Sequence, residues 1–265
     1  MSGQHWYINE DIGTVPEGLI WPERFGEEFP TLAKLEEFKR TVGSITWDAL
    51  YQQAPTSMDG GIFKRSYWSW WSKTPGVQGQ RPKGCNNKLS QGLPAKFDNV
   101  CLSVDATFKD GAKNDFVSIT TWGSYKANRY LLRRVKRRLT FTETLRVLRE
   151  EVAMAKTFIR KSMKILIEDK ANGTAIIATL QVEIGGIIAV EPDGGKEARA
   201  SAVQPVIESG NVYLPEEDGT IDQYVGEFAS FPKGRHDDEV DSTSQALRYL
   251  AESTGFRNAR GLANL

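Results

Sequence analysis

The chain has 265 residues, with 34 basic and 34 acidic side chains, and 40% of its residues are hydrophobic. This length allows one large domain, or one domain with an extension, and the zero net charge excludes attraction of nucleic acid by overall charge alone. The two cysteines and two histidines exclude a disulfide framework and a typical zinc site. No N-terminal signal and no run of about eighteen apolar residues occur, so we expect a soluble protein of a reducing compartment, without a membrane partner.

Residues 1–71 are predicted to form an α-rich extension. Apolar residues recur at helical spacing over 31–42 and 45–53. An aromatic cluster at 67–71 (YWSWW) follows, and we expect it to pack against the main domain, because a platform for stacking bases would need exposed rings. Residues 72–97 are predicted to be a linker or long loop, since Pro, Gly, Gln, Asn and Lys dominate them without an apolar period.

Residues 98–265 have the pattern of one α/β domain. Three strands joined by short turns come first, and helices then alternate with strands, which fits a mixed sheet flanked by helices. The predicted strands are 100–108, 116–123, 129–135, 164–167, 187–190 and 212–214. The predicted helices are 141–160, 174–182, 196–209, 221–231 and 237–252, the first capped by Thr140 or Thr142.

Acidic residues end the apolar runs of two of the predicted strands and begin the last predicted helix. They are Asp105, then Glu168 with Asp169, and finally Asp237 with Asp238. A single strand-end aspartate is most often a turn former or a helix cap. Several acids gathered at one edge of a sheet repel one another unless a divalent cation joins them, and oxygen ligands suit Mg²⁺ or Mn²⁺. The joint pattern therefore favours a site for two-metal cleavage of a phosphodiester.

The order of these elements and motifs resembles the ribonuclease H-like superfamily, and within it the nuclease domain of tailed-phage large terminase subunits. The matching segments are 102–109 (LSVDATFK), 165–174 (ILIEDKANGT), 196–200 (KEARA), 212–215 (VYLP) and 236–242 (HDDEVDS). Upstream, 19–25 (LIWPERF) and 49–55 (ALYQQAP) resemble the segment that joins a terminase ATPase to its nuclease. The resemblance implies an α/β fold with a ribonuclease H-like mixed sheet flanked by helices, preceded by the α-rich extension.

The resemblance also implies roles for individual residues. Asp105, Glu168 and Asp238 are the expected catalytic residues, and with Asp237 they are the expected ligands of two Mg²⁺ or Mn²⁺ ions. Asp169 remains the alternative to Glu168, because a slip of one residue along a strand reverses the face that a side chain occupies. Further residues expected near the site are Asp241 beside the ligands, His236 as an orienting or a structural residue, and Lys170, Lys196 and Arg199 as DNA phosphate contacts or ordinary solvated side chains.

The implied activity is a metal-dependent endonuclease that cleaves concatemeric double-stranded DNA during viral packaging, in the cytoplasm of the infected bacterial host. The implied partners are DNA, a terminase small subunit and a portal. No G-x-x-x-x-G-K-[ST] loop occurs, and the nearest candidate at 194–196 (GGK) is incomplete, so we expect a separate or missing ATPase domain.

Two alternatives stay open at this point. One is another ribonuclease H-like nuclease, such as a junction resolvase, and the linker-like residues 19–55 argue against it. The other is a packaging-assembly or DNA-docking module without cleavage. The intact set of acids argues against this second alternative, since a domain that does not cleave has no reason to keep them.

Overall fold

The structure is a computed structural model that describes residues 32–44, 46–47, 61–76, 79, 81–106, 116–159, 163–170 and 172–262. The segments at 19–25 and 49–55 lie outside these residues, as does most of the predicted helix at 45–53. Within the described ranges, none of the helices combines the length and the hydrophobicity that a membrane span requires.

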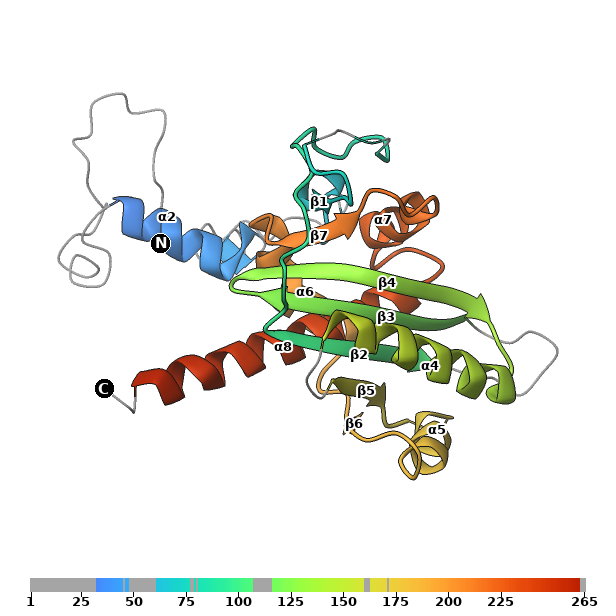
Figure 1. Ribbon diagram of the computed structural model, residues 1–265. Coiled ribbons are helices and arrows are strands. Elements are labelled where there is room, and N and C mark those ends of the chain that lie inside the picture. Colours follow the sequence, from blue (N-terminus) through green and yellow to red (C-terminus); the bar gives the residue numbers. More distant parts are fainter. Residues whose placement is uncertain are drawn as a thin grey trace, which may run out of the picture.

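In the described part of the chain, seven strands form one mixed sheet flanked by six helices (Figure 1). The strands are β1 (Ser69–Trp71), β2 (Asn99–Ala106), β3 (Phe116–Tyr125), β4 (Asn128–Arg138), β5 (Lys164–Glu168), β6 (Ile187–Val190) and β7 (Val212–Pro215). The helices are α2 (Leu32–Val42), α4 (Phe141–Ala155), α5 (Asn172–Leu180), α6 (Lys196–Glu208), α7 (Ile221–Ser230) and α8 (Asp238–Leu262), with short 3₁₀ helices η2 (Arg65–Tyr67) and η3 (Lys156–Phe158). The predicted α/β class is confirmed.

The strand order is β1-β7-β4-β3-β2-β5-β6. Strands β2, β3 and β4 are antiparallel, as expected for strands joined by short turns. Strands β5 and β6 continue the sheet parallel to β2, while β7 and β1 continue it parallel to β4. Every strand and helix predicted after residue 98 is present. The N-cap of α4 is Thr140, which forms a capping box with Glu143.

Strand β1 is absent from the predicted elements. It has three residues, which are too few to show the alternation of apolar and polar side chains by which a strand is recognised in sequence. The aromatic cluster packs inward as expected: Trp68 and Trp70 are at most 1% exposed, and the Trp71 indole N–H donates to the Leu131 carbonyl at 2.8 Å. The described part of 72–97 is irregular, and a buried Arg81–Glu216 ion pair ties it to the end of β7. The domain boundaries at 71 and 97 stay a prediction.

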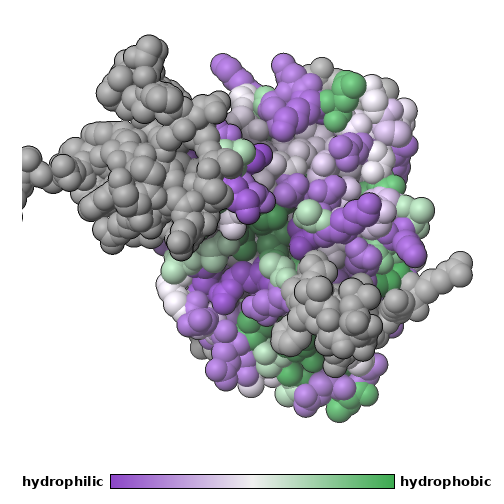
Figure 2. All heavy atoms as spheres, turned by 90° about the vertical axis from the view of Figure 1, so that its left-hand side faces the viewer, coloured by the Kyte–Doolittle hydropathy of each residue, from purple (hydrophilic) through white to green (hydrophobic). Residues whose placement is uncertain are grey.

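Two hydrophobic cores lie on opposite faces of the sheet. Helices α4 and α5 cover one face, and α6, α7 and α8 cover the other (Figure 1). Alternation along β2 sends Leu102 and Val104 to the α4 side and leaves Cys101, Ser103 and Asp105 on the α8 side. On the end of the molecule viewed in Figure 2, hydrophilic residues predominate and hydrophobic ones form smaller patches between them.

Candidate active site

Strands β2 and β5 bring two of the predicted acids to the same edge of the sheet. The strands are parallel, and Val104 pairs with Ile167, so Asp105 and Glu168 are the next residues along each strand. Ile167 belongs to the core under α4 and α5, whereas Leu166 belongs to the core under α8. Because side chains alternate, Glu168 lies on the same face as Leu166. Both acids therefore lie on the side of the sheet that α8 covers.

Helix α8 supplies further acids above this edge. Asp238 and Asp241 are one helical turn apart, so they share a face of the helix. Their side chains are 13% and 6% exposed. Across the sheet, Ser118 on β3 pairs with Asp105, and its hydroxyl lies 2.8 Å from that of Ser242 on α8. The start of α8 is thus held directly over the strand that carries Asp105.

The charges of these acids converge on Asp105. Burial raises the pKa of the Asp105 carboxyl well above its usual range, and the nearby carboxylates of Asp241, Glu168 and Asp238 raise it further, while Lys196 opposes them. Desolvation and like charges both disfavour a carboxylate, so the metal-free site resists ionisation of Asp105. A cation placed among these groups would relieve this cost.

The three cations expected to contact DNA are each paired with an acid of this group. Lys170 lies 3.0 Å from Glu168, and Arg199 lies 2.9 Å from Asp241. Lys196 contacts both Asp237, at 2.8 Å, and Asp241, at 2.9 Å. Glu168, Asp237 and Asp241 therefore have positively charged partners in the metal-free site.

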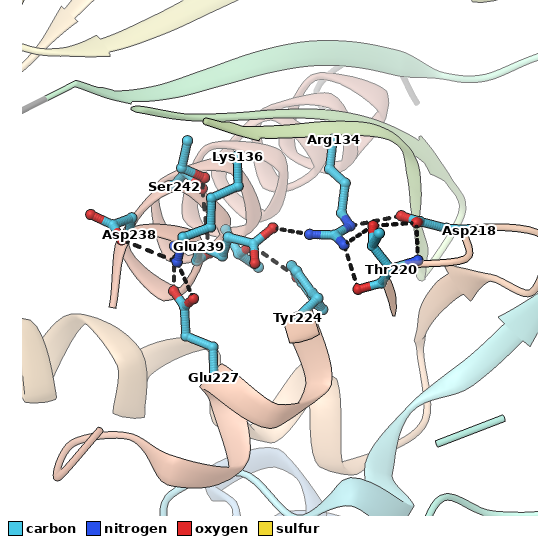
Figure 3. Close-up of polar contacts among 11 residues, drawn as sticks. Arg134, Lys136, Asp218, Thr220, Tyr224, Glu227, Asp238, Glu239 and Ser242 are labelled. Atoms are coloured by element: carbon cyan, nitrogen blue, oxygen red, sulfur yellow. Dashed lines mark hydrogen bonds and ion pairs between the residues drawn. The ribbon is translucent and has the colours of Figure 1, made fainter. Parts of the chain in front are cut away.

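A fourth cation, Lys136 on β4, was not among the predicted site residues. Its ammonium contacts Glu227 on α7 and lies 3.1 Å from Asp238, and the other oxygen of Glu227 accepts the Glu239 backbone N–H at 2.7 Å (Figure 3). Two residues earlier on the same face of β4, Arg134 pairs with Glu239 and Asp218 (Figure 3). The available sequence signal was the basic block at 133–138, in which alternate residues face α8.

The remaining candidates occupy less central positions. Asp237 is 36% exposed and pairs with Lys196, so it lies nearer the surface than Asp241. Asp169 accepts a 2.6 Å hydrogen bond from the Thr174 hydroxyl near the start of α5. The His236 ring packs edge-on against Phe116, with centroids 5.1 Å apart.

The donor chemistry of the site fits a hard divalent cation, because its four central groups are all carboxylates. These groups are Asp105, Glu168, Asp238 and Asp241. Among the described residues, however, no three Asp, Glu, His or Cys side chains stand in an arrangement ready to coordinate a metal ion. The ion pairs give the physical reason: carboxylates of the group are turned toward Lys170, Lys136, Lys196 and Arg199. The acids would need to rotate away from these partners to share one ion.

Comparison with known proteins identifies the family. A model of the terminase RNase H-like domain matches residues 102–250, which is more than half of the chain. The chain belongs to the terminase RNase H-like domain family. The matched residues run from β2 into α8 and include every acid described above. This membership confirms the resemblance found in the sequence and the ribonuclease H-like character of the sheet. A search of curated proteins with the sequence found no match.

Solved structures of terminases are among those similar to this chain. The large terminase of a thermophilic bacteriophage, in complex with ATP-gamma-S, superposes with a TM-score of 0.57 at 12% identity, covering 82% of this chain and 52% of that chain. The large terminase nuclease of the thermophilic phage G20c, with bound magnesium, gives 0.49 at 14% identity over 72% of this chain and 97% of that one. The nuclease domain of the bacteriophage SPP1 large terminase, with bound Mn, gives 0.42 at 15% identity over 58% and 88%. The chain spans about half the length of the terminase that was solved with ATP-gamma-S.

Proposed function

We propose that this chain is a metal-dependent endonuclease of viral DNA packaging that cleaves concatemeric double-stranded DNA. The observation that carries the proposal is the convergence of carboxylates from β2, β5 and α8 on the buried Asp105, whose pKa is raised by burial and then by these neighbouring carboxylates. Acids that destabilise one another in the absence of metal are typical of functional sites rather than of structural ion pairs. Membership of the terminase RNase H-like family supports the same activity.

In this proposal Asp105, Glu168 and Asp238 are the catalytic residues, and Asp237 joins them as a metal ligand. Two bound Mg²⁺ or Mn²⁺ ions would activate a water molecule and stabilise the leaving oxygen of the cleaved phosphodiester. The residues of the chain would hold these ions: β2 and β5 present two acids from the sheet, and the start of α8 presents the others from above. The buried position of Asp241 makes it a further candidate ligand.

Lys170, Lys196 and Arg199 are proposed to contact the DNA backbone. Each is paired with an acid of the metal-free site, so each would exchange a carboxylate for a phosphate when cations and DNA arrive. Contacts to phosphates carry no sequence information and weaken as salt is added. The contacts that these residues make with DNA would therefore not make cleavage sequence-specific.

The chain is proposed to act as part of a larger DNA-packaging complex. It spans about half the length of the thermophilic phage terminase that was solved in complex with ATP-gamma-S. We propose that an ATPase domain separate from this chain supplies ATP hydrolysis. We also propose that residues 1–71 form the segment leading from such a domain, and that a small subunit and a portal are partners in the host cytoplasm.

The test is cleavage of supercoiled plasmid DNA in Mn²⁺, with and without a chelator. We expect nicked and linear products only with the metal, and none from Asp105→Asn. Intact plasmid under all conditions, with retained DNA binding, would favour a DNA-docking module. Preference for a four-way junction over linear duplex would favour a junction resolvase.

A further inference from the structure

The three elements that carry the acids are joined by one amide side chain. Gln245 on α8 donates from its side-chain nitrogen to the Ser103 hydroxyl on β2, at 2.9 Å, and to the Leu166 carbonyl on β5, at 3.1 Å. Ser103 and Leu166 are direct partners in the β2–β5 register. Gln245 therefore contacts both strands at one level of the sheet while belonging to the helix above them.

This level lies immediately below the acids. Ser103 precedes Asp105 by two residues, and Leu166 precedes Glu168 by two, so each acid lies on the same face as the residue that Gln245 contacts. On α8, Gln245 follows Asp241 by four residues, which places it one turn below that carboxylate on the same helical face. A shift of any of these elements relative to the others would change the spacing of the acids.

We propose that Gln245 is a positioning residue that sets the separation of the acids from β2, β5 and α8 for metal binding, an inference that rests on the proposed nuclease function. Mg²⁺ accepts only near-octahedral geometry with oxygen ligands at about 2.0–2.1 Å, so small displacements of the acids weaken binding. Ser103 is fully buried, so water does not compete with the Gln245 amide for its hydroxyl. Gln245 itself touches neither the ions nor the DNA in this proposal.

The test compares Gln245→Leu with wild type in the full chain. The variant keeps a side chain of similar size and removes the donor, and Gln223→Leu, at an exposed position of α7, makes the same change away from both strands. Two quantities are measured: the Kd of Mn²⁺ for the DNA-free chain by calorimetry, and the Mn²⁺ concentration that gives half-maximal plasmid cleavage. Loss of a partner that orients metal ligands costs about 10–100-fold in metal affinity or activity. We expect at least a tenfold rise in both quantities for Gln245→Leu, an unchanged KM for DNA, and no change for Gln223→Leu.

A merely structural role predicts something different. It would lower the melting temperature of Gln245→Leu while leaving the Mn²⁺ affinity of the folded chain unchanged, and that result overturns the inference. If Gln245→Leu does not fold, Ser103→Ala removes one of the two acceptors. It should give a smaller rise in the Kd of Mn²⁺, and an unchanged Kd would overturn the inference.

The two proposals fail in distinguishable ways. If wild type binds Mn²⁺ and cleaves DNA while both variants match it, only the role of Gln245 is wrong. If wild type neither binds Mn²⁺ nor cleaves DNA, the proposed nuclease function is wrong, and the role of Gln245 is wrong with it. In the double variant Gln245→Leu, Ser103→Ala, the fold-loss of Mn²⁺ affinity should be smaller than the product of the two single fold-losses. Both changes act on the same contact.

Discussion

The ammonium of Lys196 on α6 lies 2.9 Å from the carboxylate of Asp241 on α8, and it contacts Asp237 at 2.8 Å. Burial opposes the charge of Lys196, but hydrogen bonds to Asp237 and Asp241 outweigh it and raise the pKa of the ammonium. Lys196 is therefore charged at neutral pH. It offsets part of the negative charge of the metal-free site, and it is positioned to meet a phosphate beside the acids.

Lys196→Met should weaken DNA binding uniformly across sequences. Removing one phosphate contact should reduce the slope of log K against log salt by about 0.9 for duplex DNA. The measurement is fluorescence anisotropy of a labelled duplex in the Asp105→Asn background, which prevents cleavage. Lys83→Met, at an exposed loop position, is the control. An unchanged salt slope in Lys196→Met would remove Lys196 from the DNA contacts.

Asp105→Asn should stabilise the metal-free protein and abolish cleavage. Burial and the neighbouring acids raise the pKa of Asp105, so ionising this carboxyl at neutral pH costs free energy. The uncharged amide of Asn avoids that cost. Cleavage should fall below about 1% of wild type, because even partners of metal ligands contribute about 10–100-fold. Thermal melting in chelator and plasmid nicking measure the two effects. Asp222→Asn, whose carboxylate is 72% exposed, should change neither. A lower melting temperature in Asp105→Asn would contradict the described repulsion.

Glu168→Gln and Asp169→Asn should separate the two neighbouring acids. Glu168 lies on the α8 face beside Asp105, so its substitution should remove cleavage. Asp169 accepts a hydrogen bond from the Thr174 hydroxyl instead, and the amide oxygen of Asn can still accept it. Asp169→Asn should therefore keep most activity and lose less than about 1 kcal/mol of stability. Plasmid nicking and urea unfolding provide the readouts. The opposite order of activities would assign the ligand role to Asp169.

Lys136→Met should destabilise the protein by about 3 kcal/mol, because removing one partner of a buried ion pair leaves uncompensated charge. The Lys136, Glu227 and Asp238 side chains are 15%, 7% and 13% exposed. Lys136→Arg, which keeps the charge, should lose less. Urea unfolding without metal is the measurement, with Lys83→Met as the exposed control. Equal losses in Lys136→Met and the control would mean that the contact adds no stability.

Much of the fold was predictable because local patterns specify it. The runs of strand-forming residues in β2 to β4, the capping box at Thr140 and the short turn between β3 and β4 all depend on residues close together in the sequence. Strand β1 has no such pattern, because it has only three residues and its partner β7 lies far along the chain. Long-range pairing of a short strand leaves no local signature.

The candidate site was predictable in part for the same reason. Asp105 and Glu168 lie at the ends of recognisable strands, whereas Lys136 contacts Asp238 and Glu227 only when β4, α7 and α8 pack together. The burial of Asp241 and the exposure of Asp237 depend on how α8 is rotated against α6 and the sheet. Helix spacing alone does not fix that rotation.

The most direct test of the proposed metal site is anomalous diffraction from crystals of the full chain soaked in Mn²⁺. We expect anomalous peaks beside the carboxylates of Asp105, Glu168 and Asp238, with Lys136 and Lys170 displaced from those carboxylates. Strong peaks at other residues, or none beside Asp105 at millimolar Mn²⁺, would contradict it.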